Sequence, residues 1–139
     1  MSNKTVDDLS NTLTPIFSIL VVDDDPQVVA TIRDILVSEG FDVETAENGK
    51  EAIDLVMGSH QFDLVITDMK MPDMDGLEVL RQVQQYKKYL PVIVMTGYAT
   101  VENGMRCVEA GAYNYIVKPF DTKSLIRLVT DSIETSFTN

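Results

Sequence analysis

Short apolar runs alternate with segments of helical periodicity along most of this chain. Five runs of four to seven residues have the length and composition of β-strands, and they cover residues 16–22, 41–46, 62–67, 92–95 and 113–117. The run at 16–22 is nearly continuous in apolar residues, as expected of a strand that is buried on both faces. The run at 41–46 instead alternates between apolar and polar positions.

Each run is followed by a segment with the apolar spacing of a helix, and a residue suited to begin a helix stands at each start. The predicted starts are Asp25 followed by Pro26, Asn48 followed by Gly49, Asp75 with Glu78 as a capping box, Thr100, and Asp121. Gly111 ends the fourth of these helices, which carries apolar residues at Val101, Met105 and Val108.

Five strands that alternate with five helices predict an α/β domain over residues 16–139, with a parallel sheet covered by helices on both faces. Residues 1–15 are polar and lack periodicity, so we expect a flexible leader there. A parallel sheet brings the carboxyl ends of its strands to one edge, where α/β proteins bind their ligands. The polar residues predicted to meet at this edge are Asp23, Asp24, Asp68, Thr96 and Lys118.

The length, composition and charge of the chain argue against several classes of protein. The 139 residues are the size of one domain, and no apolar run approaches the roughly 18 residues that a membrane span needs. The first residues lack the pattern of a secretory signal and Cys107 is the single cysteine, so we expect a cytoplasmic protein without a membrane partner. A formal net charge of −11 disfavours direct binding to nucleic acid, whose phosphates attract Lys and Arg.

The residues at the predicted sheet edge have the chemistry of phosphoryl transfer. Crowded carboxylates repel one another unless a cation compensates, and oxygen ligands without His or Cys favour Mg²⁺ or Mn²⁺. Asp68 can then act as the nucleophile toward a phosphoryl group. Lys118 and the Thr96 hydroxyl would stabilise the charge on the oxygens of the transferred group.

Each polar residue discussed so far, taken alone, also has a purely structural interpretation, and so do several of their neighbours. Asp25, Asp73 and Asp75 are explained as cap or turn residues, and His60 as an ordinary surface histidine. Taken alone, Asp68 would be a strand-terminating residue, Thr96 a turn residue and Lys118 a solvated surface lysine. Their joint placement at one edge favours the functional interpretation.

Four motifs resemble those of the receiver domains of two-component response regulators, whose fold is shared with the chemotaxis response regulator. They are Val21-Val22-Asp23-Asp24-Asp25-Pro26, Asp68 with Met71-Pro72 and Met74-Asp75-Gly76, Met95-Thr96-Gly97, and Val117-Lys118-Pro119-Phe120. The resemblance covers residues 17–137 and implies a flavodoxin-like, doubly wound sheet with the strand order 2-1-3-4-5.

The resemblance implies that Asp68 is the phosphoacceptor for a sensor histidine kinase or a histidine phosphotransfer protein. Asp23, Asp24, Asp68 and the backbone carbonyl of Lys70 would bind Mg²⁺, with Mn²⁺ as an alternative. Such a domain is a regulatory phosphoacceptor and not an enzyme, although it assists its own phosphorylation and dephosphorylation, here through Asp68, Thr96 and Lys118.

A switch is also implied by the resemblance, with Thr96 and Tyr115 as the pair that changes position on phosphorylation. The Lys118-Pro119 peptide bond is typically cis in this family. Lys70 and Tyr98 occupy the two positions that tune the lifetime of the phosphoryl group, and we expect both side chains to restrict attacking water.

Output is expected on the face formed by the fourth helix, fifth strand and fifth helix, toward a downstream effector protein or domain or a second copy in a homodimer. The residues predicted for this face are Arg106, Asn114, Lys123 and Arg127. Asn114 departs from the acidic residue of the winged-helix transcription factor subfamily, and residues 95–103 look more like receivers attached to sigma-54 activators.

Two other interpretations compete with this one. In a haloacid-dehalogenase-type phosphatase the nucleophile would be Asp23, in the pattern Asp23-x-Asp25, but the acidic pair beyond the lysine and a cap insertion are missing. A degenerate receiver would be a plain binding module, yet no residue of the acidic pocket is lost. The sequence is compatible both with a protein that acts alone and with the receiver of a longer regulator.

Overall fold

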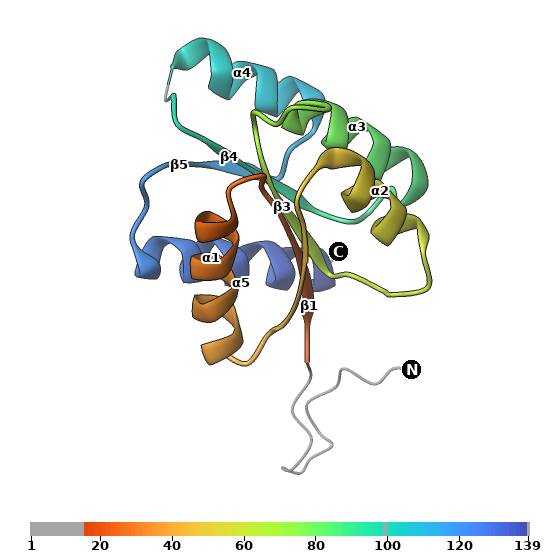
Figure 1. Ribbon diagram of the computed structural model, residues 1–139, viewed down its shortest axis with the longest axis vertical. Coiled ribbons are helices and arrows are strands. Elements are labelled where there is room, and N and C mark those ends of the chain that lie inside the picture. Colours follow the sequence, from red (N-terminus) through yellow and green to blue (C-terminus); the bar gives the residue numbers. More distant parts are fainter. Residues whose placement is uncertain (1–15, 99, 139) are drawn as a thin grey trace.

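Residues 16–98 and 100–138 are described by a computed structural model (Figure 1). The strands are β1 (Ser18–Val22), β2 (Asp42–Ala46), β3 (Leu64–Asp68), β4 (Val92–Thr96) and β5 (Asn114–Val117). The helices are α1 (Pro26–Ser38), α2 (Gly49–Met57), α3 (Gly76–Tyr86), α4 (Val101–Ala110) and α5 (Thr122–Thr138). None of these helices has the length and apolar character needed to cross a bilayer. The predicted leader, 1–15, lies outside the described residues.

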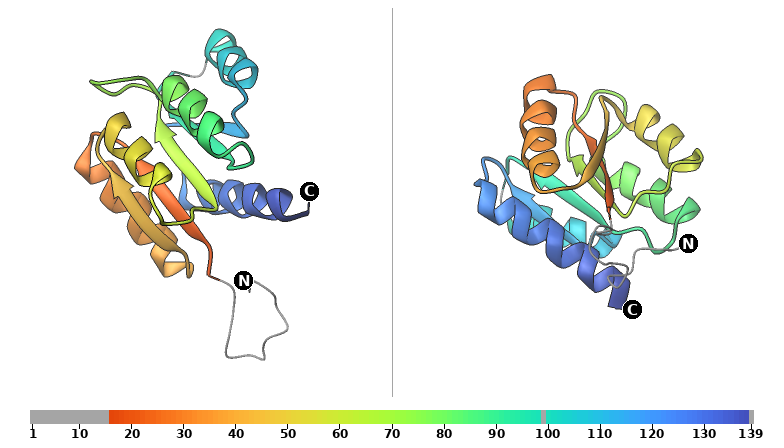
Figure 2. Two further views of the ribbon diagram at one scale, coloured as in Figure 1. Left: turned by 90° about the vertical axis from the view of Figure 1, so that its right-hand side faces the viewer. Right: turned by 90° about the horizontal axis from the view of Figure 1, so that it is seen from below.

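The five strands form one parallel sheet in the order β2-β1-β3-β4-β5, which confirms the predicted fold class and strand order. In the right-hand view of Figure 2, α1 and α5 lie on one side of the sheet and α2 and α3 on the other. All residues of β1, β3 and β4 are buried, because helices cover these central strands on both faces. The edge strand β2 is half-exposed, which explains its alternating sequence.

Neighbouring residues of each strand enter two different cores. Leu20 packs with residues of α2, α3 and α4, whereas Val21 packs on the opposite face with residues of α1 and α5. Each fully buried Leu or Ile side chain contributes roughly 2 kcal/mol through removal of its apolar surface from water. The two cores pack the sheet between the helix layers, so the carboxyl ends of its strands are held beside one another.

The predicted capping residues accept hydrogen bonds from the first helical turns. Asp25 accepts one from the Gln27 N–H at 2.9 Å, and Thr100 accepts one from Asn103 at 3.0 Å. The capping box at α3 is only half formed. The Glu78 N–H donates to Asp75 at 2.9 Å, but the Glu78 carboxylate accepts a hydrogen bond from Gln82 instead of returning to Asp75.

Two strands end one residue later than their hydrophobic patterns predict, since the third includes Asp68 and the fourth includes Thr96. The third strand, predicted to end at Thr67, includes Asp68, because Asp68 pairs with Met95 and the following Met69 N–H donates to the Met95 carbonyl at 2.8 Å. Asp68 is therefore held by the sheet itself and not by a loop.

The apolar residues of α4 face outward. Val101, Met105 and Val108 are 81%, 56% and 71% exposed, whereas the buried residues of this helix are Gly104 and Cys107. Gly104 allows the helix to approach the sheet closely, since a Cβ at this position would lie 2.9 Å from the Tyr115 hydroxyl. The helical spacing of the three apolar residues is confirmed, and it marks the surface of the helix.

Candidate functional site

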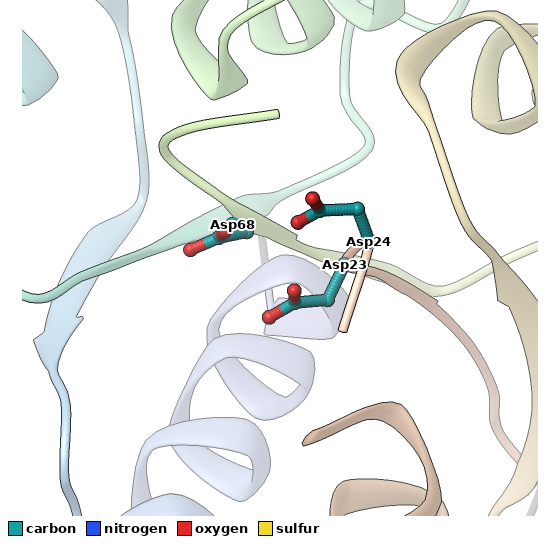
Figure 3. Close-up of side chains that lie close together, drawn as sticks. All are labelled: Asp23, Asp24 and Asp68. Atoms are coloured by element: carbon teal, nitrogen blue, oxygen red, sulfur yellow. The ribbon is translucent and has the colours of Figure 1, made fainter. Parts of the chain in front are cut away.

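Three carboxylates meet at the carboxyl edge of two neighbouring strands. Asp23 and Asp24 directly follow β1, and Asp68 ends the adjacent β3, where Val22 pairs with Thr67. One oxygen of each carboxylate lies within 4.8 Å of those of the other two, and Figure 3 shows the three side chains turned to the same side. The prediction that these residues come together is confirmed.

Asp23 is fixed in place by contacts on both carboxylate oxygens. Its Oδ1 accepts a hydrogen bond from the Asp25 N–H at 2.9 Å, and its Oδ2 lies 3.0 Å from Lys118 Nζ. Only 1% of Asp23 is exposed, whereas Asp24 is exposed to solvent. The cluster therefore has a buried, immobile side and an open side.

Lys118 bridges the two buried carboxylates from the end of β5. Its Nζ lies 2.9 Å from Asp68 Oδ1 and 3.0 Å from Asp23 Oδ2. Burial works to lower the pKa of Lys118, but the hydrogen bonds to Asp68 and Asp23 outweigh it and hold this pKa above its usual range. Lys118 is thus a fixed positive charge against the carboxylate of Asp68. The peptide bond from Lys118 to Pro119 is cis, as the family resemblance implied.

The pKa of Asp68 is raised as well, which for a carboxyl group disfavours the charged form. Burial raises the pKa of its carboxyl group, repulsion from Asp23 raises it further, and the hydrogen bond from Lys118 only partly offsets these effects. When ionised, the three carboxylates carry one formal charge each and Lys118 compensates one of them, so the cluster keeps a formal charge of −2. The site has the charge that a divalent cation would neutralise.

The donor atoms fit a hard divalent cation. All three side chains offer carboxylate oxygens, and no other group of three His, Cys, Asp or Glu ligands lies so close among the described residues. Lys70 lies two residues beyond Asp68 in the loop between β3 and α3. The use of its backbone carbonyl as a ligand stays a prediction.

The predicted switch residues lie on neighbouring strands without a hydrogen bond between them. The Thr96 hydroxyl, at the end of β4, accepts a hydrogen bond from the Tyr98 N–H at 3.0 Å and donates to the Tyr98 carbonyl at 3.3 Å. The half-buried Tyr115 ring lies against Gly104 of α4. The switch role of Thr96 and Tyr115 stays a prediction.

Two sets of contacts, one beside the site and one at the opposite end of β1, were not predicted from the sequence. Asp73, interpreted as a turn residue, accepts hydrogen bonds from two N–H groups of α2. His60, interpreted as an ordinary surface histidine, lies with its Nε2 2.6 Å from the Ser18 hydroxyl and its ring stacked on Phe62. The contact between Asp73 and Gly49 joins residues 24 positions apart, and that between His60 and Ser18 joins residues 42 positions apart. No pattern of neighbouring residues in the sequence predicts such contacts.

Comparisons with known proteins place the chain in a family. A family model described as the response regulator receiver domain matches residues 19–130. Regulatory protein AtoC of Escherichia coli (strain K12) is 35% identical over 122 residues, which are 88% of this chain and 26% of AtoC. Response regulator MprA of Mycolicibacterium vanbaalenii is 42% identical over 108 residues, which are 78% of this chain and 46% of MprA. The chain thus spans only part of the length of these relatives.

Solved structures give the same result. A CheY-like response regulator receiver domain protein from Methanospirillum hungatei JF-1 is 32% identical with a TM-score of 0.83, over 88% of this chain and 98% of that one. TrrA of Thermotoga maritima, solved in complex with Mg²⁺-BeF, is 36% identical with a TM-score of 0.74, over 84% and 98% of the two chains. This chain belongs to the family of response regulator receiver domains.

Proposed function

We propose that residues 16–139 form a phosphoacceptor switch of a two-component system, in which Asp68 receives a phosphoryl group from a phosphohistidine of a sensor kinase or phosphotransfer protein. The observation that carries the proposal is the position of Asp68 at a strand end, 2.9 Å from Lys118 and beside Asp23 and Asp24. With a divalent cation on the carboxylates, the cation and the Lys118 ammonium would complement the negative oxygens of a phosphoryl group in transfer.

In the proposed transfer, an oxygen of Asp68 forms a bond to phosphorus while the bond from phosphorus to the donor imidazole nitrogen breaks. The imidazole nitrogen keeps the electron pair and takes up a proton. Lys118 faces the oxygen of Asp68 at 2.9 Å, so its ammonium group offsets the negative charge on the transferred oxygens. Hydrolysis reverses the modification when water attacks phosphorus, and it returns the free carboxylate and inorganic phosphate.

Asp23, Asp24 and Asp68 would hold Mg²⁺, or Mn²⁺ in its place, with the Lys70 carbonyl as a further ligand. When bound, the cation supplies the charge that offsets the clustered carboxylates and the phosphoryl oxygens. The all-oxygen donor set and its formal charge of −2 support this assignment. The structure of TrrA with Mg²⁺-BeF supports it as well.

Phosphorylation would be read on the surface of α4, through Thr96 and Tyr115. The Thr96 hydroxyl would leave its contacts with Tyr98 for the phosphoryl oxygens, and the Tyr115 ring, which lies against Gly104, would transmit the change to α4. An apolar surface formed by Val101, Met105 and Val108 is exposed on this helix. This surface, with Asn114 of β5 and with Lys123 and Arg127 of α5, is the proposed contact for an effector protein or domain.

Lys70 and Tyr98 would set the lifetime of the phosphoryl group. The Lys70 ammonium lies 5.3 Å from the centre of the Tyr98 ring, so the two loops beside Asp68 contact each other through these side chains. We expect faster loss of the phosphoryl group when both residues are replaced by Ala. An unchanged rate of hydrolysis would contradict this role.

The phosphatase alternative is less compatible with the site. It would require Asp23 to attack, but Asp23 is 1% exposed and both of its oxygens already have partners, Asp25 and Lys118. Asp68 is the carboxylate that combines a strand-end position with a cationic neighbour and remaining access to solvent.

The function is tested by phosphorylation with acetyl phosphate in the presence and absence of Mg²⁺. We expect the protein to incorporate one phosphoryl group with Mg²⁺ and none after chelation with EDTA, and Asp24→Asn to slow incorporation at limiting Mg²⁺. Equal incorporation with and without a divalent cation would contradict the proposed site.

A further inference from the structure

The loop between β3 and α3 is attached to a different helix by the carboxylate of Asp73. Asp73 Oδ1 accepts a hydrogen bond from the Gly49 N–H at 3.0 Å, and Oδ2 accepts one from the Lys50 N–H at 2.9 Å. These are the first two N–H groups of α2, which have no partner within the helix. Burial slightly opposes ionisation, but the two N–H groups lower the pKa of Asp73 below its usual range, so this contact is made by the charged carboxylate.

Besides this contact, the loop is held by the Lys70 ammonium, 5.3 Å from the centre of the Tyr98 ring, and by side-chain packing of Met71 against the core. Residues 70–74 make no backbone–backbone hydrogen bond with other described residues, and the loop is closed by a bond from the Gly76 N–H to the Met69 carbonyl at 2.7 Å. The Met74 side chain packs so closely on Gly49 that a Cβ at position 49 would overlap it. Asp73 and Met74 thus attach the loop to the first turn of α2, through two separate contacts.

We propose that Asp73 is a positioning residue, which couples the first turn of α2 to the metal site by fixing the loop that carries Lys70. The inference rests on the proposed function, because it assumes that the Lys70 carbonyl contacts the cation. If the loop must hold one position for Mg²⁺ to bind, then Asp73 lowers the cost of binding by holding it there beforehand. Coupling of this kind is reciprocal, so Mg²⁺ in turn stabilises the contact between Asp73 and α2.

Calorimetric titration with Mg²⁺ alone tests the coupling, with Asp73→Asn compared with Asp75→Asn. Both variants remove one negative charge from the same loop, but the Asp75 carboxylate caps α3, where it accepts a hydrogen bond from the Glu78 N–H, whereas that of Asp73 caps α2. We expect Asp73→Asn to raise the dissociation constant for Mg²⁺ about fivefold relative to Asp75→Asn. A factor of this size is at the lower end of the range for coupling between two sites. A difference of twofold or less would overturn the proposal, and so would equal weakening by both variants, which would reveal a purely electrostatic effect.

Hydrogen exchange gives a second, reciprocal measurement in the wild-type protein. We expect Mg²⁺ to slow exchange of the Gly49 and Lys50 amides more than that of the Glu51 amide, which the Asn48 side chain caps at 2.8 Å. Equal slowing of all three would indicate general stabilisation of α2 and would count against Asp73. A wild-type protein that binds no Mg²⁺ would refute the metal site and the inference together, whereas normal binding in Asp73→Asn would refute the inference alone.

Discussion

At the scale of single residues, the site around Asp68 combines groups that oppose one another in the metal-free protein. Asp68 and Asp23 share the single ammonium group of Lys118, and burial raises the pKa of Asp68. An ionised Asp68 therefore costs the metal-free fold some stability, as often happens where residues are placed for function. The same ionised carboxylate can bind a cation and act as the nucleophile in the proposed phosphoryl transfer.

We predict that Asp68→Asn stabilises the metal-free protein at neutral pH. Because the pKa of Asp68 is raised on folding, the folded protein binds this proton more readily than the unfolded chain does, and Asn mimics the protonated form. A gain of about 1 kcal/mol would raise the melting temperature by roughly 3 °C. Thermal melts in EDTA should show the difference at pH 7, and it should shrink as the pH falls and Asp68 takes up its proton. A lower melting temperature for Asp68→Asn at pH 7 would contradict this.

Sequence reasoning found the residues of the cluster because parallel strands place their carboxyl ends together. Asp23, Asp68 and Lys118 each follow or end a recognisable strand, so their meeting follows from topology. The partners of Asp73 could not be found in this way. Its contacts depend on the packing of α2 beside α3, and packing between helices leaves no local signal in a single sequence.

At the scale of elements, the first residue of α3, Gly76, lies so close to the backbone of Asp68 that no side chain fits at this position. A Cβ on Gly76 would overlap the Asp68 carbonyl oxygen and lie 3.0 Å from the Met69 Cα, both of which are backbone atoms that cannot rotate away. Gly76 thus lets the first turn of α3 contact the strand end that presents Asp68.

We predict that Gly76→Ala destabilises the protein by about 1–3 kcal/mol, since it forces a shift of helix against strand. Gly97→Ala is the matched control, because a Cβ there meets no atom within 4 Å. Urea denaturation of both variants measures the difference. A Gly76→Ala variant as stable as Gly97→Ala would contradict the close approach.

Helix α4 shows why periodicity alone does not identify a core face. Its largest apolar residues are on the surface, and the helix packs on the sheet through the small residues Gly104 and Cys107. A pattern of large apolar residues normally marks the buried face. In α4 it marks the proposed contact surface, and only the position of the helix beside Tyr115 reveals this.

We predict that Val101→Thr, Met105→Gln and Val108→Thr each change the free energy of unfolding by less than about 0.5 kcal/mol, as expected for exposed positions. Leu80→Ala, at a fully buried position of α3, should cost about 2–5 kcal/mol. Urea denaturation curves compare the two sets. A loss above 2 kcal/mol from any α4 variant would show that this surface belongs to the core.

At the scale of the whole molecule, two cores hold a sheet whose carboxyl edge brings together residues from four strands, β1, β3, β4 and β5. Fold class and site follow from alternation of strands and helices, but that alternation alone does not give the order β2-β1-β3-β4-β5. The order came from the resemblance, and it matters because it makes β1 and β3 neighbours, so that Asp23 and Asp68 share Lys118.

We predict that Mg²⁺ stabilises the whole fold by mass action, because it would bind the assembled carboxylates and not the unfolded chain. A free concentration 100 times the dissociation constant would add about 2.7 kcal/mol. In thermal melts across a series of Mg²⁺ concentrations, the melting temperature should rise steadily for the wild type and much less for Asp24→Asn. Identical rises in the two proteins would show that any bound cation occupies a different site.

The central claim, that Asp68 is the phosphoacceptor, is tested most directly by locating the phosphoryl group. The protein is phosphorylated with acetyl phosphate and Mg²⁺, the acyl phosphate is reduced with borohydride to homoserine, and the modified residue is mapped by peptide mass spectrometry. We predict modification of Asp68 alone and none in Asp68→Asn. Modification of Asp23, or equal modification of the Asp68→Asn variant, would contradict the account.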